Sequence, residues 1–369
     1  MTDEKLKLPL YAKVSILIIG LIASLAILYI ARSIIVPIIF AVIIAIVLHP
    51  VVNFFLRIKI NRVVAILITI LLTFLIICAL GLLIVSQISK FTESLPALID
   101  KLRILLDQAI IWASGYFDIN PLKINDWISK TQGDLVNSSS AAIGQTLVIL
   151  GNALVIFFLL PVYIFLILFY HPILIEFIHR IFGSSDQVKV SQIVTQIKTV
   201  IQKYLIGLII EAGLVATLNT TTLLILGIEY ALLIGIISAL VNVIPYIGGL
   251  IAVSLPVIIA LATESSYWPA VWVLIIFYVI QLVDNNFIVP KIVASKVKIN
   301  ALFSIIVVLA GNALWGIPGM FLSIPLLAIA KLIFDHIESL KPWGFLLGDT
   351  MPPLLKIKAI FKKKINRSA

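Results

Sequence analysis

The sequence predicts an all-α polytopic membrane protein, and three observations support this fold class. Of its 369 residues, 62% are apolar and 12% are charged, whereas about 25% are charged in an average soluble domain. Apolar runs such as residues 14–31, 63–85 and 147–170 are close to the roughly 20 residues that a helix needs to cross a bilayer. Lys and Arg gather between these runs, as they do in cytoplasmic loops.

We expect about six full transmembrane helices plus two re-entrant or broken helical hairpins, which makes about eight hydrophobic segments. The basic residues that flank the first two spans are Lys5, Lys7 and Lys13 before the first, and Arg57, Lys59 and Arg62 after the second. Because short cytoplasmic loops accumulate such residues, they predict a cytoplasmic amino terminus. The basic tail predicts a cytoplasmic carboxyl terminus for the same reason.

Five regions follow from the pattern of apolar runs and polar segments. They are the N-terminal transmembrane helices (residues 1–86), an extracytoplasmic amphipathic segment (87–145), a transmembrane helix with a cytoplasmic surface helix (146–203), a core region with two broken hairpins (204–334) and a basic cytoplasmic tail (335–369). In the second region, apolar residues recur at helical spacing: Leu95, Leu98, Leu102, Leu106 and Ala109. This spacing predicts an amphipathic helix that covers the membrane domain or another subunit.

The core region contains two pairs of short apolar arms, each pair interrupted by proline and glycine. Residues 231–244 and 250–261 flank the first interruption, and residues 301–314 and 320–331 flank the second. Each arm is too short to cross the membrane alone, and proline and glycine disfavour a helix interior. The predicted break or hinge residues are Pro245, Gly248, Gly249, Pro318 and Gly319. They either shape a binding site or only kink the backbone.

The two hairpins also match each other weakly in sequence. Asn242 corresponds to Asn312, and the triplet that begins at Ser254 corresponds to the triplet that begins at Ser323. Either the half from residue 204 onward contains an inverted repeat, or Leu-rich helices match by chance. Inverted repeats with broken helices place a binding site near the middle of the membrane in many secondary carriers.

Two carboxylates, Glu211 and Asp284, lie within apolar runs of this region. A charged group inside a membrane is costly, so each needs a physical reason. Each either binds a proton or a cation, or pairs with a nearby base, Lys203 or Lys291. As a pair they also allow a weaker interpretation as catalytic carboxylates of an intramembrane enzyme.

Amide side chains accompany these carboxylates. Gln281, Asn285 and Asn286 lie on the helical turns next to Asp284, and Asn242 and Asn312 precede the two breaks. The first three suit a small polar ligand or a hydrated cation, or they form hydrogen bonds between helices. The last two either bind ligand or cap the broken backbone.

Three segments resemble the AI-2E (autoinducer-2 exporter) family: VIPYIGG at 243–249, QLVDNNFIVP at 281–290 and GIPGMFLSIP at 316–325. Many members carry a glycine shortly after the proline that matches Pro290, where this chain has Ala294, Ser295 and Lys296. The resemblance implies a multi-pass permease of the bacterial inner (cytoplasmic) membrane that forms homo-oligomers. It also implies either export of autoinducer-2 or sodium(lithium)/proton antiport, since each is proposed for some members.

We therefore expect a permease or exporter of a small polar solute or a cation, driven by a proton or sodium gradient. The alternative is a non-transporting scaffold whose partner-binding part is residues 87–145. The expected partners are the lipid bilayer, a small-molecule or ion substrate and further copies of the chain. We do not expect nucleic acid, because Phe361 is the only aromatic residue among the basic residues from Lys356 to Arg367. No GxxxxGK[ST], HExxH or GxSxG motif is present and Cys78 is the only cysteine, so we expect no enzyme, cofactor or metal site.

Overall fold

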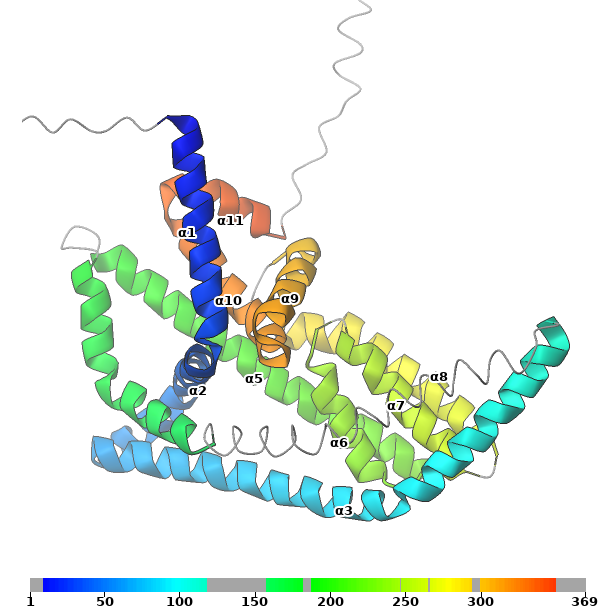
Figure 1. Ribbon diagram of the computed structural model, residues 1–369. Helices are drawn as coiled ribbons and strands as arrows, with labels where there is room; N and C mark the ends of the chain where they lie inside the picture. The colour runs from blue at the N-terminus through cyan, green and yellow to red at the C-terminus, as the bar shows by residue number, and fades with distance from the viewer. Residues whose placement is uncertain are drawn as a thin grey trace, which may run out of the picture.

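The computed structural model describes residues 9–117, 157–181, 187–245, 247–264, 266–293 and 299–349, which form helices joined by short connections. The first part contains α1 (Leu10–Ile30), α2 (Arg32–Arg57), α3 (Arg62–Phe117) and the helix Phe157–Ile181. The second part contains α5 (Gln187–Ile225), α6 (Ala231–Asn242), α7 (Ile247–Thr263), α8 (Trp268–Val283), the π-helix η2 (Asp284–Val293), α9 (Ala301–Trp315), α10 (Ile317–His336), the 3-10 turn η4 (Glu338–Leu340) and α11 (Lys341–Leu347). The all-α fold is confirmed (Figure 1).

Seven helices in the described part of the chain are long and apolar enough to cross a membrane, one more than the sequence predicted. The additional one is α10, with 20 residues. Its predicted start after the break was too late, because Pro318 does not interrupt the helix. Proline lies in the first turn of α10, where its missing N–H group is not needed.

The long helix α3 runs without interruption past residue 86, so the helix expected around residues 95–109 is a continuation of a spanning helix. Figure 1 shows its last part as an arm that bends away from the bundle. Lys101 Nζ donates to the carbonyl oxygens of Thr263 (3.0 Å) and Glu264 (2.6 Å). The arm is thereby attached to the end of α7, while residues 118–145 of the predicted segment lie outside the described residues.

The structure also corrects the predicted boundary at residue 203. The expected surface helix and the following span form one helix of 39 residues, α5, with no end at Tyr204. Neither proline nor glycine occurs between Val200 and Ile206, so nothing in the local sequence ends the helix there. Of the span expected at residues 147–170, the part from Phe157 onward is described and is helical.

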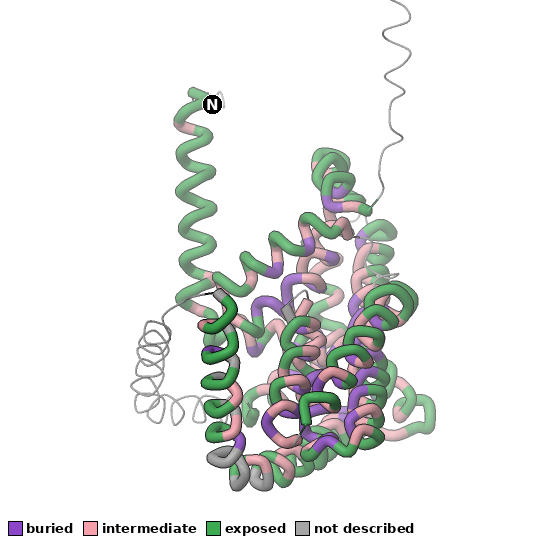
Figure 2. The backbone as a smooth tube through the Cα atoms, turned by 90° about the vertical axis from the view of Figure 1, so that its right-hand side faces the viewer, coloured by how far each residue is buried: buried purple, intermediate pink, exposed green. Residues whose placement is uncertain are grey.

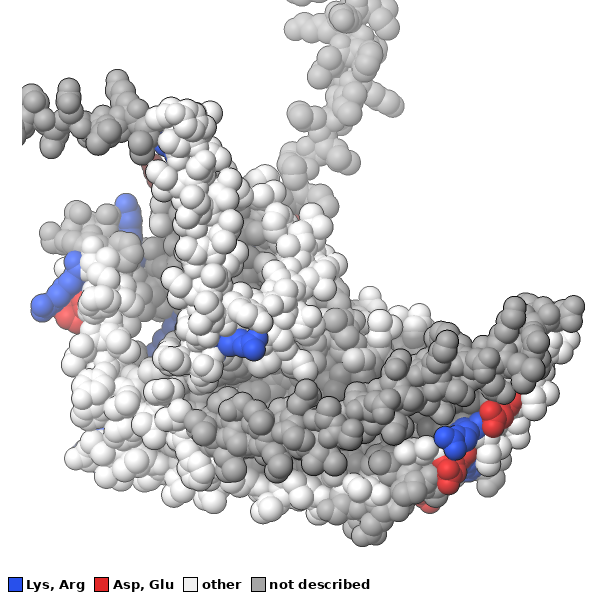
Figure 3. All heavy atoms as spheres, in the orientation of Figure 1, with Lys and Arg blue, Asp and Glu red and all other residues white. Residues whose placement is uncertain are grey.

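Buried residues form three clusters that α2 and α5 connect. One joins α5, α6, α7 and α8, the second joins α2, α3 and the helix Phe157–Ile181, and the third joins α2, α5, η2 and α10. By contrast α1 has no buried residue and stands apart from the bundle (Figure 2). The described atoms in Figure 3 are mostly uncharged, and their acidic and basic groups are confined to a few places, chiefly the arm of α3 on the right and a smaller group at the left edge. Such an apolar exterior suits a lipid environment.

The two predicted hairpins are present as α6–α7 and α9–α10, but their breaks are shorter than predicted. The described residues of the first break are 243–245, and the second break is Gly316 alone, with a φ of +67°. Gly248, Gly249, Pro318 and Gly319 therefore lie in the helices that follow and not in the breaks. Glycine tolerates the positive φ that the second turn requires.

Candidate functional site

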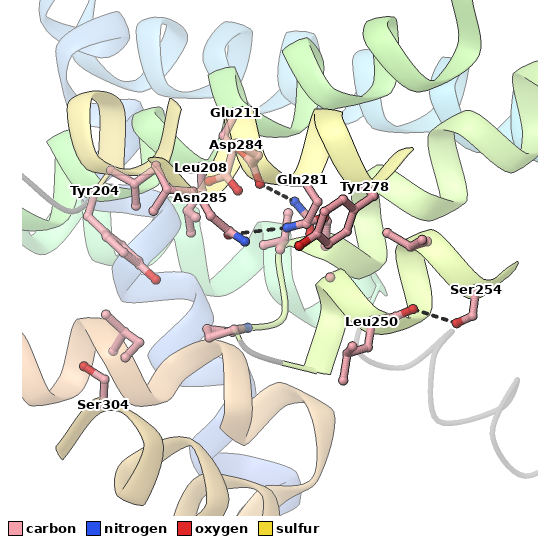
Figure 4. Close-up of a pocket in the computed structure, with 18 of the residues that line it drawn as sticks. Tyr204, Leu208, Glu211, Leu250, Ser254, Tyr278, Gln281, Asp284, Asn285 and Ser304 are labelled. Carbon is pink, nitrogen blue, oxygen red and sulfur yellow. Dashed lines mark hydrogen bonds between the residues drawn. The ribbon is translucent and has the colours of Figure 1, made fainter. Parts of the chain in front are cut away.

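A cavity of about 890 Å³ lies between α5, the hairpin α6–α7, α8 and η2 (Figure 4). The second hairpin contributes only Ser304 and Ile324 to its wall, and Asp349 after α11 also lines it. Its polar lining residues are Tyr204, Glu211, Asn242, Ser254, Tyr278, Gln281, Asp284, Asn285, Ser304 and Asp349. The cavity is large enough for a small organic molecule.

Asp284 lies where α8 changes from an α-helix to the π-helix η2. Pro290 has no N–H group to donate to the preceding turn, and a π-helical turn of this kind is frequent at functional sites. The side chain of Asp284 is 1% exposed. Its Oδ2 accepts a 2.8 Å hydrogen bond from Asn242 Nδ2, and its Oδ1 has no hydrogen-bond partner among the described residues.

Glu211 on α5 is the second buried carboxylate of the cavity, and it is 4% exposed. One turn earlier, Gly207 lets α5 approach η2 closely, because a Cβ atom there would lie 2.7 Å from the carbonyl oxygen of Ile292. Glu211 interacts electrostatically with Asp284, and its Oε2 has no hydrogen-bond partner in the part of the chain that the structure describes. The two side chains lie beside each other in Figure 4.

Neither carboxylate takes part in an ion pair among the described residues. The ion pairs there, Arg180–Glu176, Lys331–Asp335 and Lys341–Glu338, all lie elsewhere. The expected alternative of a structural pair with Lys203 or Lys291 is thus not what the structure shows. Uncompensated carboxylates in an apolar interior are costly and call for a bound proton or cation.

Amide groups continue the polar wall along α8. Gln281 Nε2 lies 3.4 Å from Asn285 Oδ1, a weak hydrogen bond. The amide of Gln281 also packs on Gly249, where a Cβ atom would lie 2.9 Å from Nε2. The first turn of α7 therefore approaches the amide wall of α8 at a position where only a glycine fits without displacing Gln281.

The structure gathers some of the predicted residues at the cavity and places others elsewhere. Those at the cavity are Asp284, Glu211, Gln281, Asn285, Asn242, Pro245 and Gly249. Asn286 is exposed and donates to the carbonyl of Leu282 (2.8 Å), and Asn312 is exposed on α9, outside the cavity lining. Gly248, Pro318 and Gly319 do not line the cavity either.

Several lining residues were not predicted: Tyr204, Ser254, Tyr278, Ser304 and Asp349. Tyr278 could have been found, because Leu274, Tyr278, Gln281 and Asn285 follow helical spacing and so share one face. Asp349 could not, because its place depends on how the end of α11 packs against the start of α9: the backbone N–H of Asn300 donates to Leu347 O at 3.0 Å, and Gly348 pairs with Ile299. Asp349 also lies in the region expected to be a basic tail.

The arrangement of charges limits what the cavity can bind. Among the residues that the structure describes, its lining includes three acidic side chains and no Lys, Arg or His. A cation or a neutral polyol therefore suits it better than an anion. The described residues contain no group of three or more His, Cys, Asp or Glu side chains that could hold a metal ion.

A polytopic helical bundle with a polar cavity beside broken helices is an architecture found in many membrane transport proteins. The family model "AI-2E family transporter" matches residues 18–339. The chain is therefore a member of the AI-2E transporter family, a family of membrane transport proteins.

Individual relatives agree with this family. The chain is 23% identical over 260 residues to the "Putative transport protein YueF" of Bacillus subtilis, an alignment that covers 69% of this chain and 70% of YueF. It is 29% identical over 133 residues to YrrI of the same organism and 27% identical over 124 residues to the AI-2 transport protein TqsA of Escherichia coli. These two alignments cover 37% of YrrI and 36% of TqsA.

Proposed function

We propose that this protein is a secondary transporter that exports a small polar solute, such as autoinducer-2, or a cation, and that it uses a proton or sodium gradient. The observation that carries the proposal is the pair of buried carboxylates that line one cavity, Glu211 and Asp284, each with one oxygen that has no hydrogen-bond partner among the described residues. A carboxyl group in this position is neutralised either by a proton or by a cation. A carboxyl group that alternates between these two states would couple movement of the proton to movement of the cation.

The hydrogen bond between Asn242 and Asp284 suggests how a bound cation could move the first hairpin. Asn242 is the last residue of α6 and precedes the break of the first hairpin. A cation bound to Asp284 would compete with the Asn242 amide for the same oxygen. Binding of the cation would thereby free the break of the first hairpin from η2. The cation would then bind with different affinity when the hairpin is attached to η2 and when it is released, and such a difference is what couples binding to a movement.

The choice of substrate rests on the shape of the cavity and on a relative. The volume of about 890 Å³ accommodates a small organic solute with its hydration water. Hydroxyl and amide groups at Tyr278, Gln281 and Asn285 offer donors and acceptors to a polyol. TqsA bears the name AI-2 transport protein, which makes autoinducer-2 the first solute to test.

The expected location is the bacterial inner membrane, with both termini in the cytoplasm. This orientation follows the distribution of Lys and Arg in the loops. With this orientation, export corresponds to movement of the solute from the side of the termini to the opposite side. The outward direction rests on the family resemblance.

Flux measurements in proteoliposomes test the proposal. The purified protein is reconstituted, and proton and sodium fluxes are recorded with and without autoinducer-2. Asp284→Asn is expected to lower flux to the level of empty liposomes, because the amide keeps the shape of the side chain and cannot bind a proton or cation in the same way. The matched control is Asp100→Asn on the exposed arm of α3, which should transport like the wild type.

Two results would contradict the proposal. Equal flux in the wild type, the variant and empty liposomes, under conditions in which a known antiporter works, would favour the scaffold interpretation. Normal ion and solute flux in Asp284→Asn would show that this carboxylate does not take part. Size-exclusion profiles identify a variant that fails to fold, so that lost flux is not confused with lost protein.

A further inference from the structure

A cluster of basic side chains lies at a second junction of helices, with none of its members in the lining of the cavity. It consists of His49 on α2, Arg62 on α3, His171 on the helix Phe157–Ile181 and Lys198 on α5. The rings of His49 and His171 have centroids 4.7 Å apart, and Lys198 Nζ lies 3.0 Å from His49 Nδ1. We call these four residues the basic cluster.

The charge of the basic cluster is not compensated within the described part of the chain. The charged groups that act on His49 are Lys198, His171 and Arg62, all of them basic. None of the four residues is in an ion pair among the described residues. All four are only partly buried, so a ligand can reach them. The two permanent cations of the cluster, Lys198 and Arg62, both act on the ring of His49, and a bound anion would compensate their charge.

The donors of the basic cluster are held in place by neighbouring groups. Asn53 Nδ2 and Lys198 Nζ both lie 3.0 Å from His49 Nδ1. Because Lys can only donate, this nitrogen accepts, and the neutral ring carries its proton on Nε2. Arg62 Nη2 donates to Leu168 O at 2.9 Å, and its guanidinium lies over the ring of Phe169.

These contacts leave further N–H groups for a ligand. A lysine has three donors and an arginine has five, and the contacts above use only part of them. Several charge-assisted donors from different helices suit an oxyanion with several acceptor oxygens, such as a phosphate group. A single carboxylate would satisfy fewer of them.

The surroundings of the basic cluster indicate that a lipid carries this phosphate. Large apolar side chains that follow His49 or His171 by two to six residues on the same two helices are exposed: Val51, Phe54, Ile173, Leu174 and Phe177. These surfaces would accept acyl chains while the basic groups hold the headgroup. Arg57 and Lys59 follow at the end of α2, and basic residues near a membrane surface attract anionic lipid.

We propose that the basic cluster is a binding site for the phosphate group of an anionic phospholipid, which joins α2, α3, α5 and the helix Phe157–Ile181. A free phosphate ion would use the same donors, so the test must distinguish the two sources. The proposal does not depend on the transport substrate, because the site shares no residue with the cavity.

Native mass spectrometry of the full-length protein in neutral detergent provides the test. The delipidated protein is titrated with phosphatidylglycerol, with phosphatidylcholine and with inorganic phosphate as a competitor. We expect the wild type to bind phosphatidylglycerol about tenfold more tightly than phosphatidylcholine. Lys198→Gln should lose about this factor, whereas Lys198→Arg should keep it because it retains the charge.

Lys203→Gln is the matched control, since it makes the same change on an exposed part of α5. It should alter phosphatidylglycerol binding by less than about twofold. Equal losses in Lys198→Gln and Lys203→Gln, or no preference in the wild type, would overturn the proposal. Displacement of phosphatidylglycerol by equimolar inorganic phosphate would overturn the lipid assignment and leave a site for the free ion.

Discussion

The two hairpins, α6–α7 and α9–α10, repeat one packing contact but differ in their part in the cavity. In each, a glycine in the first turn of the second arm lies against the residue before an asparagine of the first arm: Gly248 against Val241, and Gly319 against Gly311. Asn242 then donates to Asp284 in the cavity, whereas Asn312 is exposed outside it.

The matching serines, Ser254 and Ser323, also differ in what they contact. Ser254 lines the cavity and bonds only within its own helix, to Leu250 O at 2.6 Å. Ser323 is buried, and its Oγ lies 2.8 Å from Val307 O on α9 and 2.6 Å from Gly319 O. The first hairpin therefore supplies polar groups to the cavity, while the second uses the corresponding group to hold its arms together. The matching residues of the two hairpins thus make the same packing contact, but they do not contribute equally to the cavity.

The largest effect is expected for the glycine contact that the hairpins share. In Gly248→Ala and Gly319→Ala the added methyl group would overlap the carbonyl oxygen of Val241 or Gly311. Because backbone atoms cannot yield easily, each variant should lose about 1 to 3 kcal/mol of stability. Thermal unfolding of the protein in detergent measures this. Gly213→Ala on α5, where a Cβ atom meets nothing within 4 Å, is the control, and equal midpoints in all three variants would contradict the close contact.

Substitution of Asn242 and of Asn312 should affect transport to different extents, because only the first lies in the cavity. Asn242→Ala removes the hydrogen bond to Asp284. Because a hydrogen bond to a charged group contributes about 1.5 to 3 kcal/mol, we expect flux to fall by about tenfold. Asn312→Ala should change flux by less than about twofold, because its side chain lies outside the cavity. Proteoliposome flux at matched protein content measures both. Similar losses in the two variants would mean that the second hairpin also reaches the substrate.

The smallest effect is expected for the serines. Ser323→Ala should cost about 1 kcal/mol of stability, because it removes a hydrogen bond between α9 and α10. Ser254→Ala should cost less, since its bond stays within one helix. Unfolding midpoints of the two variants, measured side by side, test this order. A larger loss in Ser254→Ala would reverse the assignment of a structural role to the second hairpin.

Much of the candidate site could be predicted from the sequence, for a local reason. A carboxylate such as Asp284 or Glu211 inside an apolar run stands out because the membrane makes it costly. Gln281 and Asn285 follow from Asp284 by helical spacing. Asn286 was included because it neighbours Asp284 on the same helix, and Asn312 because it precedes the second break. Both lie outside the cavity lining, because neither position along a helix nor a nearby break decides which face meets another helix.

The sequence by itself determined the helical membrane fold, the two hairpins and the acidic character of the site. The thickness of the bilayer imposes length and composition on each span, and proline and glycine act on the backbone where they stand, so both signals are local. The tertiary structure alone decided that Tyr204, Ser304 and Asp349 share one cavity, and that Asn242 rather than Asn312 reaches Asp284. These relations join segments far apart in the chain, and they depend on how the helices pack.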